Sequence, residues 1–170
     1  LFSKGFIQKE LKKGDYFLRE GKRCNHLAFI LKGAMICYYT KDGKQFIDEF
    51  SLDNEFITDY SGFLTHSPSN KYIQCLENCT IYVISNEILK NLYQIKSIEL
   101  ERLGRIMAEQ LYLQWHEKSK SLLMDNATER YLKLIQNRPK LPQRVPQHLI
   151  AKYLGITPES LSRIRKVAFQ

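Results

Sequence analysis

The sequence predicts an α+β chain: an antiparallel β-roll, then a long helix, then a C-terminal helix-turn-helix. Three observations predict this order. Residues 12–84 consist of short β-type runs separated by turn residues, residues 86–123 follow a helical period, and residues after 147 read as two short helices around a glycine and a proline. We place the boundaries at 1–96 for the roll, 97–123 for the long helix and 124–170 for the helix-turn-helix domain.

The roll is predicted from runs rich in aromatic and β-branched residues at 27–31, 35–40 and 45–50. The pair Asp42-Gly43 lies between two of these runs, and a type I′ hairpin turn needs positive φ at both of its central positions. Several short strands at this spacing, with no helix between them, are typical of a small antiparallel roll or barrel.

The long helix carries a stripe of apolar residues. Leu103, Ile106, Gln110 and Leu113 follow a 3-4-3 spacing, which is that of a coiled-coil seam with one polar layer. The stripe could pack on the roll of its own chain, but so long a helix would project beyond a small roll and expose apolar surface. We therefore expect a homodimer whose interface contains Leu100, Leu103, Ile106, Met107, Gln110 and Leu113.

The long helix is expected to break near residues 125–128, with Thr128 as the N-cap of a second helix at 129–137. The next segment, residues 138–146, holds three prolines and is therefore expected to be a non-helical connector or a short strand. A domain boundary is expected near residues 121–128.

The segment from Gln147 onward fits a helix-turn-helix where that geometry is demanding. Ala151 is small at the helix crossing, Gly155 suits the left-handed conformation that ends the first helix, and Thr157-Pro158 is a good start for the second. The shared apolar core is predicted to comprise Ile150, Leu154, Ile156, Leu161 and Ile164.

The outward face of the second helix suits duplex DNA. Arg163 can donate two hydrogen bonds to guanine, and Glu159 can accept from cytosine. The net charge of +8 lies in the last 53 residues, which hold 11 Lys+Arg and 3 Asp+Glu, as expected for a part that meets a polyanion. A charged, merely solvated face is the alternative. The predicted DNA-binding residues are Lys152, Thr157, Glu159, Ser160, Ser162, Arg163 and Lys166.

These stretches resemble the Crp/Fnr family of bacterial transcription regulators. The matching segments are FLREG at 17–21, LAFILKG at 27–33, the long helix, and TPESLSRI at 157–164. The resemblance implies a homodimer with a cyclic-nucleotide-binding-type roll that binds an unknown small-molecule effector. It also implies double-stranded DNA as partner, RNA polymerase as a further partner if the protein is an activator, and base-reading roles for Glu159 and Arg163. The resemblance further implies a winged helix-turn-helix, in which a wing normally follows the second helix.

The effector pocket matches the family less well. Cyclic-nucleotide binders open their phosphate cassette with Gly-Glu and close it with Arg-Ser or Arg-Thr, whereas here we align Asn54-Glu55 and Ser69-Asn70 with these pairs. Loss of the arginine removes a charge-assisted hydrogen bond of roughly 1.5–3 kcal/mol, so tight cyclic AMP binding is not expected. Glu55 is either a ribose ligand or a structural acid. Lys71 could replace the arginine, and Trp115-His116 stand near the base-facing positions.

No metal, cofactor or catalytic residue is predicted. The histidines at 26, 66, 116 and 148 are isolated, so a cupin-like enzyme lacks its ligand cluster. The four cysteines are expected to be free thiols, with Cys75 and Cys79 on one face of a strand. A non-DNA interaction module that binds RNA or protein is a further alternative, although the reading face has no aromatic platform. The longest strongly apolar run, at 27–31, is far too short to span a membrane, so a cytoplasmic protein is expected.

Overall fold

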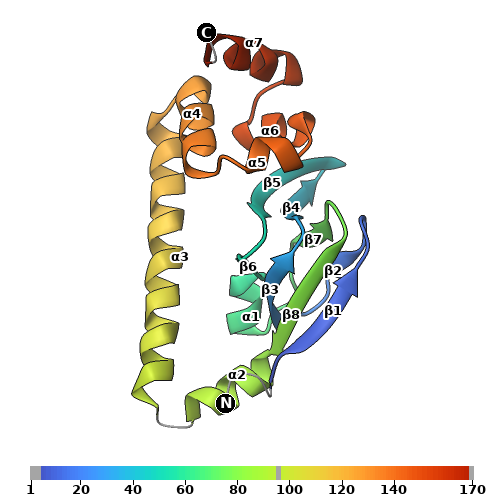
Figure 1. Ribbon diagram of the computed structural model, residues 1–170, viewed down its shortest axis with the longest axis vertical. Helices are drawn as coiled ribbons and strands as arrows, with labels where there is room; N and C mark the ends of the chain where they lie inside the picture. Colours follow the sequence, from blue (N-terminus) through green and yellow to red (C-terminus); the bar gives the residue numbers. More distant parts are fainter. Residues whose placement is uncertain (1–4, 95–96, 169–170) are drawn as a thin grey trace.

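Two four-stranded antiparallel sheets form the predicted roll in the computed structural model, which describes residues 5–94 and 97–168 (Figure 1). The first sheet has the order β1 (Ile7–Leu11), β8 (Cys79–Ser85), β3 (His26–Lys32), β6 (Phe56–Ile57). The second has the order β2 (Tyr16–Leu18), β7 (Tyr72–Cys75), β4 (Met35–Lys41), β5 (Lys44–Ser51). The α+β class is confirmed.

The hairpin that joins β4 to β5 has the turn conformation that its residues predict. Asp42 and Gly43 have φ angles of 51° and 72°, so both occupy the left-handed region that a type I′ turn needs. The expectation of no helix between the strands is wrong, however, because α1 (Tyr60–Thr65) lies between β6 and β7. This short helix inserts the buried Phe63 into the core of the roll.

The region of helical period that begins at residue 86 contains two helices in the structure. α2 (Asn86–Gln94) packs at the base of the roll, and α3 (Ile98–Met124) runs alongside the roll (Figure 1). Ser97 is the N-cap of α3, because its hydroxyl accepts a hydrogen bond of 3.4 Å from the backbone N–H of Leu100. The side chain of Tyr93 in α2 packs tightly against Gly104 of α3.

Two details of the C-terminal helices correct the sequence expectations. The cap of α4 (Ala127–Asn137) is Asn126 rather than Thr128, because Asn126 and Glu129 form a reciprocal capping box. The segment expected to be non-helical contains a one-turn helix, α5 (Leu141–Arg144). Its Pro142 is tolerated because it lies in the first turn, where a backbone N–H has no helical partner. The chain continues through α6 (Gln147–Leu154) and α7 (Pro158–Ala168).

The four cysteines are free and buried, but Cys75 and Cys79 do not share a strand. Cys75 ends β7 and Cys79 begins β8, because a tight turn separates them. In the part of the chain that the structure describes, no three histidine, cysteine, aspartate or glutamate side chains group as a metal site would require. No described helix is long and apolar enough to cross a membrane.

The chain has two apolar cores, and β4 contributes to both. Met35 and Cys37 point into the core between the two sheets. Ile36 and Tyr38, on the opposite face of the same strand, belong to a second core that the C-terminal helices complete. The members of this second core are Ala34, Ile36, Tyr38, Phe50, Leu52, Tyr131, Leu141, Val145, Leu149, Ile150, Ala151, Leu154 and Leu161. The C-terminal helices therefore pack directly on the outer face of β4 and β5.

Candidate functional site

The turn between α6 and α7 has the local geometry that the residues predict. Gly155 ends α6 in the left-handed conformation, with φ 69°, and its N–H donates to the carbonyls of Ala151 and Lys152. Ala151 is fully buried, as a close helix crossing requires. Thr157 precedes α7, and its hydroxyl accepts a 3.2 Å hydrogen bond from the N–H of Ser160. Leu161 of α7 is buried in the second core.

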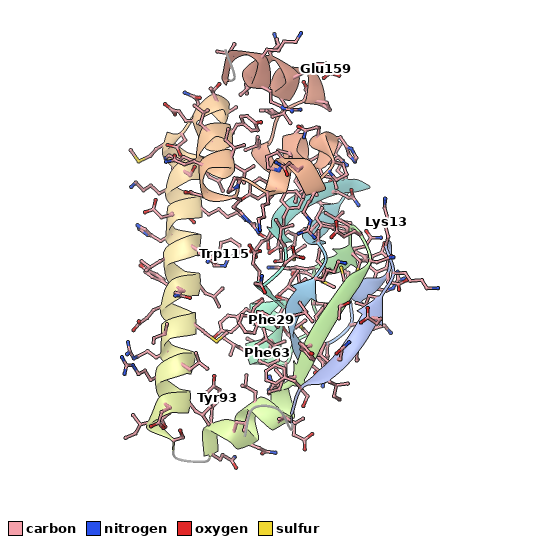
Figure 2. All side chains as sticks on the ribbon, viewed as in Figure 1. Lys13, Phe29, Phe63, Tyr93, Trp115 and Glu159 are labelled. Atoms are coloured by element: carbon pink, nitrogen blue, oxygen red, sulfur yellow. The ribbon has the colours of Figure 1, made fainter. Side chains whose placement is uncertain are left out.

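The opposite face of α7 is exposed and polar. Glu159, Ser162, Arg163 and Lys166 are exposed, and Figure 2 shows Glu159 at the outer end of the molecule, away from the roll. Arg163 makes one weak hydrogen bond of 3.3 Å, from its guanidinium to the hydroxyl of Ser160. Hydrogen bonds from its own backbone N–H and from Thr157, with the charge of Arg163, lower the pKa of Glu159, so this carboxylate is ionised at neutral pH.

Lys152 differs from the other predicted DNA-binding residues in its contacts. It lies on α6, and its ammonium group donates a 3.3 Å hydrogen bond to the side-chain oxygen of Gln45 on β5. The structure thus gathers six of the seven predicted residues on or next to α7 and places the seventh against the roll.

The predicted seam of α3 is only partly covered in a single chain. Leu103 and Leu113 are 45% and 58% exposed, and no residue of α3 is buried. Gln110 is exposed, whereas Leu100, Ile106 and Met107 are half-buried. Other positions of α3 that contact the rest of the chain include Gly104, Trp115 and Lys118. A single chain therefore leaves Leu103, Gln110 and Leu113 of the stripe exposed.

The first pair of predicted effector residues does not face the interior of the roll. Asn54 is a turn residue with φ 66° before β6. The carboxylate of Glu55 accepts hydrogen bonds from the N–H of Leu52, at 2.9 Å, and from the guanidinium of Arg138, at 2.5 Å. In this conformation Glu55 is a structural acid between the roll and the C-terminal helices.

The second pair lies near Lys71. Ser69 is buried, and its hydroxyl accepts a 3.0 Å hydrogen bond from the N–H of Lys71, whereas Asn70 is exposed. The ammonium group of Lys71 is 2.9 Å from a carboxylate oxygen of Asp48 and lies 5.8 Å from the ring centroid of Trp115. His116 is exposed and stacks on Tyr112 of its own helix, so the structure brings together Lys71 and Trp115 but leaves His116 apart.

Asp48 is the residue of this region that the sequence did not reveal. Its buried carboxylate lies between two ammonium groups, those of Lys71 and Lys118, each at 2.9 Å. Burial alone would raise the pKa of Asp48, but the two lysines outweigh burial and hold this pKa below its ordinary value. Lys118 also lies 4.6 Å from the ring centroid of Trp115. The only available signal was an acidic residue inside a predicted strand.

A family model supplies the decisive comparison. Residues 8–96 match the model of the cyclic nucleotide-binding domain, which is more than half of the chain. The chain belongs to the cyclic nucleotide-binding domain family. The sequence has no significant match among curated proteins.

Solved structures extend the likeness of this family member beyond that domain. FixK2 from Bradyrhizobium japonicum is 19% identical, with a TM-score of 0.79 over 95% of this chain and 83% of that chain. The c-di-GMP responsive global regulator CLP of Xanthomonas campestris is 19% identical, with a TM-score of 0.74 over 98% and 88%. A putative Crp/Fnr-family transcriptional regulator from Eubacterium rectale is 14% identical, with a TM-score of 0.72 over 97% and 79%. The cyclic nucleotide-binding domain and the helices that follow it thus have the Crp/Fnr fold.

Proposed function

We propose that this protein is a cytoplasmic transcription regulator that binds double-stranded DNA as a homodimer through a helix-turn-helix formed by α6 and α7. The observation that carries the proposal is the exposed polar face of α7, where Arg163 and Glu159 stand on a helix whose other face is anchored by Leu161. A face held rigidly by its buried side can present these groups to base edges without first ordering the helix. In this role the protein carries out no catalysis.

The two charged residues suit different bases. The guanidinium of Arg163 can donate two hydrogen bonds to O6 and N7 of guanine, and the ionised Glu159 can accept one from N4 of cytosine. Lys166 lies on the same exposed face and suits a phosphate. Among the described residues, the guanidinium of Arg163 makes a single weak hydrogen bond, to Ser160, so little is lost when it turns to a base.

Dimerisation through α3 would supply a second copy of α7 for contact with DNA. The seam has Leu103 and Leu113 largely exposed, and a second copy would bury these side chains together with Ile106 and Met107. A two-fold dimer presents its recognition helices about 34 Å apart, which is one turn of the duplex. The operator should therefore be close to palindromic.

The roll is proposed to bind a small-molecule effector other than cyclic AMP. A charge that could replace the missing arginine exists in Lys71, but this charge is already neutralised by Asp48. The phosphate of a cyclic nucleotide would have to displace the buried carboxylate of Asp48 from Lys71. The base of the same nucleotide would have to pack against Trp115. RNA polymerase is a further partner if the protein activates transcription.

The test is a selection from random duplexes, followed by affinity measurements on the selected site at two salt concentrations. Arg163→Ala should cost about 1–3 kcal/mol per half-site and relax the preference at one base pair, because a bidentate contact is lost. Lys166→Ala is the matched control on the same helix. It should weaken all sequences alike and flatten the salt dependence, because a phosphate contact releases counterions whatever the base. Uniform weakening by Arg163→Ala would refute the base-reading role.

A further inference from the structure

The connector between α4 and α6 carries an arginine that joins three turns of the roll. The guanidinium of Arg144 forms ion pairs with Asp53, in the turn after β5, and with Glu77, in the turn between β7 and β8. Asp53 also accepts a 2.7 Å hydrogen bond from the N–H of Gly33, between β3 and β4. The hydrogen bonds from Arg144 lower the pKa of Asp53, so the pair stays charged at neutral pH.

A second arginine anchors the other end of the same connector. The guanidinium of Arg138 donates to the backbone carbonyl of Phe50, at 2.6 Å, and to the carboxylate of Glu55, at 2.5 Å. Both arginines are half-buried, and each binds two groups of the roll. Arginine that holds more than one acceptor in this way is fixed in orientation as well as in position.

The segment between the two arginines is closed by apolar packing. Leu141 is fully buried and Val145 nearly so, both in the second core with Ala34 and Leu52 of the roll. Turning the connector would break the ion pairs and expose this apolar surface together. By contrast, in the described ranges the side-chain hydrogen bonds from α3 to the strands of the roll all come from Lys118. The two arginines and this packing therefore hold α6 on the roll, and α7 packs in turn on α6 and α4.

We propose that Arg138 and Arg144 form a charge clamp that fixes the orientation of α7 relative to the roll and so sets the half-site spacing that the dimer accepts. The inference rests on the proposed function, and both arginines are positioning residues. Because the duplex makes one turn in about 10–10.5 base pairs, each inserted base pair rotates one half-site by about 34–36°. A clamped α7 cannot follow this rotation, whereas an unclamped one can.

The experiment measures dissociation constants of the full chain for the selected operator and for versions with one or two base pairs inserted between the half-sites. The variants are Arg144→Gln, Arg138→Gln and the pair of both. Lys140→Gln is the control, because it removes one positive charge from the same connector at an exposed side chain. Glu77→Gln is a milder variant that removes one arm of the clamp and leaves Asp53 in place.

The wild-type chain and Lys140→Gln should prefer the native spacing by at least about tenfold, which is comparable to the cost of one mismatched base pair. The clamp variants should reduce this ratio to about threefold or less, and Glu77→Gln should reduce it partly. Equal weakening at every spacing would mean that the arginines only stabilise the fold, and it would overturn the clamp while leaving the operator intact. If the double variant fails to fold, an unchanged ratio in Glu77→Gln and in Arg144→Gln overturns it. Failure of the wild-type chain to select any operator would instead refute the proposed function.

Discussion

The second core joins the roll to the C-terminal helices, so a single truncation in it should destabilise the entire chain. Ile150 is fully buried in α6 and packs in the cluster that contains Ile36 and Phe50 of the roll. Ile150→Ala removes buried methyl groups and leaves a cavity, at a cost of about 2–5 kcal/mol. For a chain of this length the midpoint of thermal unfolding should fall by roughly 2–4 °C per kcal/mol, or about 4–20 °C.

The assay is thermal unfolding at one fixed protein concentration, followed by circular dichroism and by the fluorescence of the single tryptophan, Trp115. Both signals should move together in one transition, because both sides of the core lose the same contact. Ile30→Ala is the matched control, since Ile30 is equally buried but lies between the two sheets. Two transitions, of which Ile150→Ala lowers only one, would show that the C-terminal helices fold independently and would refute the shared core.

Three further outcomes are expected. Replacing Leu103 and Ile106 together with glutamate should give monomers in analytical ultracentrifugation, whereas Arg105→Glu on the opposite side of α3 should not; a dimer that persists in the double variant would exclude this seam. Calorimetric titration with cyclic AMP should give no low-micromolar binding, and tight binding would show that Lys71 or another group supplies the missing charge. The folded-state pKa of Asp48 lies below its unfolded value, so the stability it contributes is present above the ordinary pKa of an aspartate and is lost as the pH falls through the lower folded-state pKa. Asp48→Asn should therefore lower the unfolding midpoint at pH 7 and flatten its decline in acid, and an equally steep decline would contradict the assignment.

Features that depend on local backbone chemistry could be predicted from the residues themselves. The hairpin at Asp42-Gly43 and the helix end at Gly155 follow from positive φ, which few residues adopt. The exposed face of α7 also follows from the sequence, because helical spacing fixes which residues lie opposite Leu161. Prediction of a local feature fails where two residues could take the same role. Asn126 and Thr128 could both cap α4, and Asn126 does so because it forms a capping box with Glu129.

The sequence by itself determined the class of the fold, the order of its parts and the character of each helix face, because these depend on spacing and on turn residues. Only the tertiary structure decided what Asp48, Glu55 and Arg144 do, because each is paired with a residue far away in the sequence. Such pairings depend on which faces of the roll and the helices meet. A single sequence does not show which of its distant residues are in contact. The outer face of β4 is the clearest case, since its residues from Met35 to Tyr38 form an apolar run, but the sequence cannot say that the C-terminal helices cover Ile36.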